Sequence, residues 1–128
     1  MSYNISRTTS GDFEGVIARV KEALKNEGFG VLTEIDVAGT FKTKIGKDFR
    51  PYWILGACNP NFAHEALNIE PNIGVMLPCN IVVQRRDNGE VEVSSIDPAE
   101  TMEAVGNPEL AGLAAKVRQA LERAIAKA

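Results

Sequence analysis

The sequence predicts an α+β fold, in which one mixed, mainly antiparallel sheet of about five strands packs against two long helices and several short ones. Three observations predict it. Residues 13–24 and 109–126 carry apolar side chains at helical spacing. Several short segments between them alternate apolar and polar residues or form compact apolar runs, as strands do. Asp87-Asn88-Gly89 is a hairpin-turn sequence, which requires an antiparallel pair of strands.

The first strand and the first long helix are predicted from alternation and from helix-capping residues. Residues 3–8 alternate apolar and polar side chains, which is typical of a strand. Ser10 or Asp12 then caps the helix, because a short side-chain oxygen accepts hydrogen bonds from free first-turn N–H groups. Gly28 and Gly30 are placed to end it, since glycine adopts the left-handed conformation at a helix C-terminus.

A strand, a short helix and a buried strand are predicted next. Residues 31–37 alternate in the manner of a strand. Residues 39–49 fit either a strand or a helix, and their apolar residues four apart favour a short helix that ends near Gly46. Residues 52–57 form a compact apolar run, which predicts a buried strand.

A second short helix precedes the segment with the strongest strand pattern. Asn59 and Pro60 predict its start, because asparagine caps first-turn N–H groups and proline lacks only an N–H that would be free there. Residues 74–85 alternate throughout, which predicts a strand that lies at an edge or is bulged at Pro78, where the ladder lacks a donor. The connection to the preceding strand is long enough for a crossover, so the two are allowed to be parallel.

The C-terminal third is predicted to contain a strand and two helices. Residues 90–96 pair back through the hairpin turn. Residues 97–105 begin with Asp-Pro and form a further helical segment, which residues 106–108 break. The last helix runs over residues 109–126, with acidic residues near its start and basic residues in its second half, as the helix dipole favours.

Composition predicts one globular domain over residues 1–128. The chain is 45% hydrophobic and 24% charged, with a net charge of −3. This charge and the low aromatic content argue against nucleic acid or an anionic membrane as a partner. Two cysteines, no signal peptide and no apolar stretch of about 18 residues predict a cytoplasmic protein that does not span a membrane.

Cys58, His64 and Cys79 form the first candidate site, because thiolates and imidazoles are ligands that zinc, copper and iron prefer. The cysteines are 21 residues apart, which matches no zinc-finger or CxxC spacing. Three readings stay open: a metal site, a functional thiol, or two cysteines that only pack in the core, where free cysteine is common. Cys58 is predicted to be the more reactive thiol, because it ends a strand and precedes a helix start.

Two charged segments are further candidates. Lys42, Lys44, Lys47 and Arg50 could hold a phosphate or carboxylate, although such a run is more often a solvated face. Seven acidic residues between positions 87 and 109 could bind Ca²⁺ or Mg²⁺ or perform acid–base chemistry. Several of them lie at predicted helix starts, which favours a role in complementing helix dipoles.

Two segments carry a family resemblance. Residues 52–60, Tyr-Trp-Ile-Leu-Gly-Ala-Cys-Asn-Pro, and residues 77–80, Leu-Pro-Cys-Asn, resemble domain-of-unknown-function family 302, and residues 44–46 and 91–98 fit its pattern. The resemblance is close over about residues 31–100 and looser in the flanking helices. It implies a small α+β domain, mostly stand-alone and bacterial or archaeal, that pairs as a homodimer. It also favours a shared site at Cys58, Asn59, Pro60, Pro78, Cys79 and Asn80.

Three functions are compatible with these observations. The first, which we favour, is a homodimeric binding module with a small-ligand pocket near the two Cys-Asn pairs, where an adjacent glycine or proline lets backbone N–H groups face a ligand. The second is a thiol-redox or metal-assisted enzyme that uses Cys58 or Cys79, with His64 as base. The third is a structural or protein-interaction domain. The sequence leaves open which cofactor the protein uses, if any, and whether the protein is an enzyme.

Overall fold

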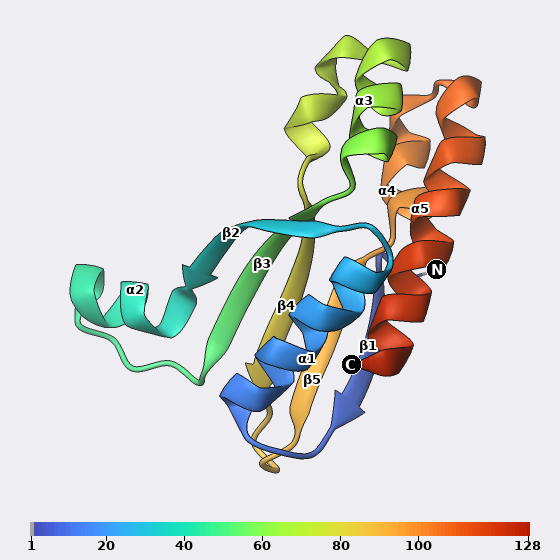
Figure 1. The fold of residues 1–128 in the computed structure, drawn as a ribbon. Helices are drawn as coiled ribbons and strands as arrows, with labels where there is room; N and C mark the ends of the chain where they lie inside the picture. Colours follow the sequence, from blue (N-terminus) through green and yellow to red (C-terminus); the bar gives the residue numbers. More distant parts are fainter. Residues whose placement is uncertain (1) are drawn as a thin grey trace.

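One five-stranded sheet forms the centre of the structure, a computed structural model that describes residues 2–128 (Figure 1). The strand order is β1-β5-β4-β3-β2, and every neighbouring pair is antiparallel. The strands are β1 (Asn4–Thr9), β2 (Gly30–Asp36), β3 (Tyr52–Cys58), β4 (Cys79–Arg85) and β5 (Val91–Ile96). The α+β class and the single five-stranded sheet are as the sequence predicts.

Two long helices, α1 (Phe13–Asn26) and α5 (Pro108–Lys127), pack side by side on one face of the sheet (Figure 1). Both were expected from their apolar spacing, and their apolar faces are buried. The short helices are α2 (Val37–Ile45), α3 (Pro60–Ile69), η1 (Pro71–Met76), α4 (Pro98–Thr101) and η2 (Met102–Val105). No helix of the described residues is long and apolar enough to cross a membrane.

The core has two parts that α5 connects. The larger part lies between the sheet and the two long helices and includes Leu55, Ile81 and Leu121, which are fully buried. The smaller part lies between α3, η1, η2 and the first half of α5, around Ile73 and Leu110. Because a helix rises about 1.5 Å per residue, α5 is long enough to cover the sheet and to extend past its end.

The parallel pairing that the sequence allowed for the third and fourth strands is wrong. β3 and β4 pair antiparallel, with Ala57 opposite Cys79. A parallel pair would require the intervening segment to cross a face of the sheet and return to the opposite end. Instead α3 and η1 leave the end of the sheet, pack on α5 and return to the end that the chain left (Figure 1).

The strand predicted over residues 74–85 begins only at Cys79. Its expected first half forms the end of η1 and a short link, because Pro71 starts a helical turn and Pro78 cannot donate to a ladder. The prediction of an edge or bulged strand is therefore wrong: β4 is central, and Pro78 lies before it. Cys79 is likewise the first residue of its strand and not a mid-strand residue.

Local signals placed most other boundaries within one or two residues. Asp12 and Asn59 cap α1 and α3 as predicted. α2 confirms the helical alternative for residues 39–49, and Gly46, with φ of 65°, is its C-cap. The helix expected over residues 97–105 is divided into α4 and η2.

Candidate functional site

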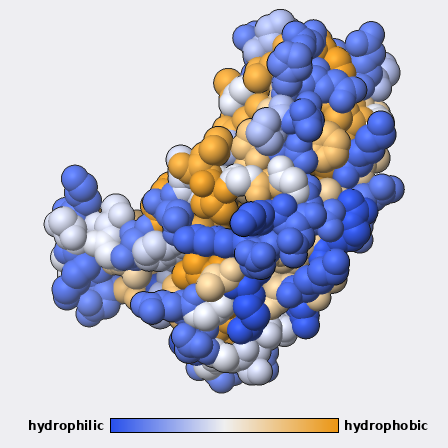
Figure 2. Space-filling model, viewed as in Figure 1, coloured by the Kyte–Doolittle hydropathy of each residue, from blue (hydrophilic) through white to orange (hydrophobic). Residues whose placement is uncertain are grey.

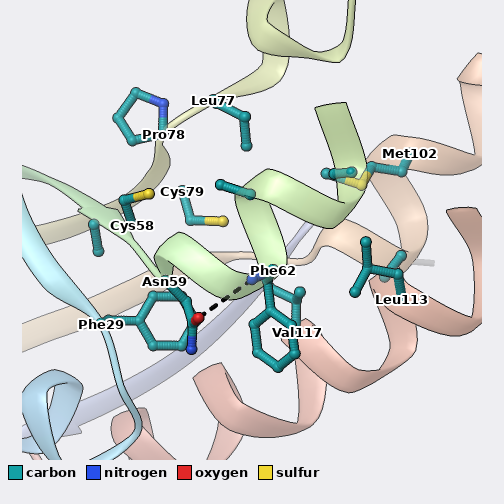
Figure 3. A pocket seen from close by; sticks show the side chains of 14 residues that line it. Phe29, Cys58, Asn59, Phe62, Leu77, Pro78, Cys79, Met102, Leu113 and Val117 are labelled. Carbon is teal, nitrogen blue, oxygen red and sulfur yellow. Dashed lines mark hydrogen bonds between the residues drawn. The ribbon is translucent and has the colours of Figure 1, made fainter. Parts of the chain in front are cut away.

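A small pocket lies where β3 ends and β4 begins, between α3 and α5 (Figure 3). Cys58, Asn59, Pro78 and Cys79 line it, as do apolar side chains of α3, η2 and α5. The cavity measures about 30 Å³, which is room for about two water molecules. The pocket therefore joins the two parts of the core and brings together four of the six residues predicted for a ligand site.

Cys79 is the thiol on the core side of this pocket. As the first residue of β4 it faces α5, and only 7% of its surface is exposed. Burial raises the pKa of the Cys79 thiol to about 11, and the nearby Cys58 thiol contributes in the same direction. Cys79 is therefore protonated at neutral pH, the state in which a thiol packs as an apolar group and is a poor nucleophile.

Cys58 is half-buried, and the next residue, Asn59, is the N-cap of α3. The Asn59 Oδ1 accepts hydrogen bonds from the backbone N–H groups of Asn61 and Phe62 at 3.2 and 3.3 Å. Its Nδ2 donates to the carbonyl oxygen of Glu27 at 3.4 Å. Asn59 thus ties the start of α3 to the end of α1, and its amide is occupied by structural hydrogen bonds.

The two thiols begin on opposite faces of the sheet. Ala57 is the direct partner of Cys79, and successive side chains of a strand point to opposite faces. Cys58 is one residue past Ala57, so its Cβ is directed away from the face that Cys79 occupies. Both thiols still line the pocket, which lies at the end of the sheet. Both are free in the structure.

Gly56 permits the close packing beside the pocket, and sequence reasoning missed it. A Cβ added to Gly56 would lie 2.1 Å from Thr33 Oγ1 and 2.8 Å from Pro78 Cγ. Only a residue without a side chain therefore fits under Thr33 and Pro78. A glycine inside an apolar strand is a known signal of such a close approach, and this signal was available in the sequence. The apolar lining residues Phe62, Met102 and Val117 were also missed, because they come from three distant segments.

Other predicted site residues lie away from the pocket. Pro60 begins α3 and is exposed, and Asn80 faces the opposite side of the sheet from Cys79. His64 is exposed on α3, with its Nε2 3.5 Å from Asn68 Nδ2, and it does not line the pocket. Within residues 2–128 no three cysteine, histidine or acidic side chains gather as a metal site would require. The structure therefore does not assemble the Cys58–His64–Cys79 set.

The charged segments are dispersed as well. Lys42 pairs with Asp48 at 3.0 Å on the surface of the α2 region, and Lys44 and Lys47 are exposed. Arg50 lies apart from them, against the sheet.

Of the acidic residues at positions 87–109, Asp97 is a helix cap, and Glu100, Glu103 and Glu109 lie in the first turns of helices, as the dipole argument favours. Asp97 is 4% exposed; its Oδ1 accepts from Ala99 N at 3.0 Å and its Oδ2 from Arg118 Nε at 2.9 Å. This hydrogen bond from Arg118 to Asp97 raises the pKa of the Arg118 guanidinium. Asp97 thus joins α4 to α5.

Comparison with known proteins identifies the family. The family model for the domain of unknown function DUF302 matches residues 5–128. The chain belongs to the DUF302 family. The resemblance carried by residues 52–60 and 77–80 is confirmed, and the DUF302 match extends through both flanking helices.

A solved DUF302 structure shows the same fold. An uncharacterized conserved DUF302 protein from Bacillus stearothermophilus, whose crystal structure is known, has 30% sequence identity to this chain. The match covers 99% of this chain and 98% of that one. The TM-score is 0.93. No curated protein matches the chain.

Proposed function

We propose that the protein binds a small molecule through an apolar group that enters the pocket beside Cys58 and Cys79. The observation that carries this proposal is the lining: two thiols together with aromatic and aliphatic side chains such as Phe62, Met102 and Val117. None of the described residues that line the pocket is charged. Sites for small molecules are mostly apolar clefts with a few polar groups that orient the ligand.

The size of the cavity restricts the ligand. A volume of about 30 Å³ is far below the several hundred Å³ of a typical drug-sized site. A short alkyl chain or a small ring would therefore enter only after a lining side chain moves. Met102 is suited to this, because three rotatable bonds let methionine adapt its shape. Half-buried Cys58 is then the lining thiol nearer to the polar part of such a ligand.

The enzyme alternative has less support. A nucleophilic thiol needs a lowered pKa or an adjacent base. Burial raises the pKa of Cys79, and His64 lies outside the pocket. Cys58, just before the start of α3, is the remaining thiol for such chemistry. A purely structural role for both cysteines predicts that no ligand protects Cys58.

Protection of Cys58 from alkylation tests the binding proposal. We expect n-hexanol to slow the reaction of Cys58 with iodoacetamide several-fold in the native protein, because the alcohol's chain occupies the pocket. Ala63→Leu should abolish this protection, since Ala63 lines the pocket and the larger side chain fills it. Ala115→Leu is the matched control, because Ala115 is an exposed alanine of α5 outside the pocket. Equal labelling rates with and without n-hexanol, or equal protection in both variants, would contradict the proposal.

We further propose that the protein is a homodimer, and α2 is the surface that supports this prediction. None of its nine residues is buried, and it protrudes from the sheet (Figure 1). Helices this short are marginal in water without packing. Apolar side chains are exposed on and beside it, including Ile35 and Ile45 at 46% and 62%, and Figure 2 shows hydrophobic surface between α2 and the α3 end.

A second copy would cover this surface and complement its charge. Residues 37–50 contain four basic residues and one acidic residue, whereas the whole chain has a net charge of −3. We expect a native mass spectrum at micromolar concentration to show a dimer that Ile45→Lys weakens. A monomer at all concentrations would contradict the proposed homodimer.

A cytoplasmic location stays a prediction from the sequence.

A further inference from the structure

A second site is indicated at the other end of β3 and β4, where Arg50 and Arg86 line the same hollow. β3 and β4 run from this end to the cysteine pocket, so the two sites are separated by the length of the strands. Continuing the pairing of Tyr52 with Gln84 places Arg50 opposite Arg86, and Arg85 N donates to Pro51 O at 3.0 Å, which extends the ladder in this direction. Two like charges opposite one another destabilise a sheet unless a countercharge lies between them.

The guanidinium of Arg50 is held in one orientation. It lies 4.4 Å from the centre of the Phe49 ring and 5.6 Å from that of Tyr52, within the range of cation–π attraction. Its Nε donates to Gln84 Oε1 at 2.9 Å. Gln84 is 8% exposed and donates its own Nε2 to Glu92 Oε1 at 3.2 Å. A buried amide and two aromatic rings therefore position Arg50 in advance, which lowers the entropic cost of binding.

The outer edge of this guanidinium is available. Within residues 2–128, the Arg50 side chain donates its hydrogen bond through Nε, and no group accepts one from Nη1 or Nη2. These two N–H groups form the fork that binds both oxygens of a carboxylate or phosphate.

Arg86 lines the adjoining hollow, whose volume is about 360 Å³ and which Arg50, Asp87 and Asn88 complete. Arg86 Nη1 forms an ion pair with Glu92 Oε1 at 3.6 Å, which is longer than an ordinary hydrogen bond, so an anion bound in the hollow competes with the Glu92 carboxylate for Arg86.

We propose that Arg50 and Arg86 form a binding site for an oxyanion, either a phosphate or a carboxylate group of a small molecule. The sequence predicted an anion site at Lys42, Lys44, Lys47 and Arg50. The proposed site includes only Arg50 of these four, together with Arg86. Asp87 lies in the hollow and opposes an anion there, so the site discriminates against the most highly charged ligands.

Titration with inorganic phosphate and with acetate, at constant ionic strength, tests the site. We expect one or both anions to shift the Nε–Hε NMR signals of Arg50 and Arg86 in a saturable manner below about 50 mM, where screening does not yet dominate. Saturation by phosphate alone identifies a phosphate site, and saturation by acetate alone identifies a carboxylate site. Arg50→Gln and Arg86→Gln should each abolish saturation, and Asp87→Asn should lower the dissociation constant severalfold.

Lys44→Gln is the matched control, because it removes one exposed positive charge outside the hollow. It should leave the titration unchanged. Arg86→Gln changes an exposed side chain and should keep the wild-type melting temperature. Arg50→Gln also removes the hydrogen bond to the buried Gln84 amide and should lower the melting temperature, so Arg86→Gln keeps the proposal testable. Absence of saturation with both anions in the wild-type protein, or an equal loss in Lys44→Gln, would overturn the proposal. None of these substitutions changes a residue that lines the cysteine pocket, so the outcome does not depend on the alkylation experiment at Cys58.

Discussion

Native Cys79 is expected to react with iodoacetamide at pH 8 at least about 100-fold more slowly than in the unfolded protein. Burial raises its pKa from 9.0 to about 11, and two pKa units correspond to about 100-fold less thiolate, the reactive form. Its low exposure restricts the reagent further. Cys58, which is half-buried, should be labelled first. Single-thiol variants Cys58→Ser and Cys79→Ala, analysed by mass spectrometry over time, measure each rate separately.

The same pKa predicts how pH affects the protein. Because the folded state disfavours the Cys79 thiolate, its contribution to stability is complete below pH 9 and is lost as pH rises through about 11. Labelling of native Cys79 should accelerate over this range, and the free energy of unfolding should fall more in wild type than in Cys79→Ala. If Cys79 instead reacts before Cys58 at pH 8, the assignment of the two thiols is wrong.

Gly56→Ala is expected to lower the free energy of unfolding by about 2 kcal/mol, within the range of overpacked cores. The new Cβ would meet Thr33 Oγ1 at 2.1 Å and Pro78 Cγ at 2.8 Å, so both neighbours must shift. Gly30→Ala is the matched control, because Gly30 also lies in a strand and a Cβ there meets no atom within 4 Å. Chemical denaturation of the variants measures the difference.

Thr33→Ala should relieve part of this strain. The double variant with Gly56→Ala is expected to lose less stability than the sum of the two single variants, since the clashing hydroxyl is absent. Displacement of Pro78 should also expose the adjacent Cys79, so Gly56→Ala should speed Cys79 labelling. Equal stability of Gly56→Ala and Gly30→Ala would show that the strand ends are not closely packed at this point.

Local signals in the sequence determined most elements of the protein. Apolar spacing placed the two long helices, and Asp12 and Asn59 marked helix starts, because capping involves atoms only two or three residues apart. The Asp87-Asn88-Gly89 turn joined β4 to β5. Residues 52–60 and 77–80 were sufficient to indicate the DUF302 family. For the site, the sequence also identified Cys58 and Cys79 as neighbours of one pocket.

Only the tertiary structure decided which residues share a site, because strand pairing and helix packing depend on contacts between distant segments. It made β3 and β4 antiparallel, since α3 and η1 pack on α5 beyond the end of the sheet and return the chain to the end that it left. It started β4 at Cys79 and so placed Asn80 on the opposite face, while α3 carried His64 to the surface. The β3–β4 register, which continued beyond Tyr52 and Gln84 sets Arg50 opposite Arg86, has the same origin: a slip of one residue between the two strands would direct these side chains to opposite faces of the sheet.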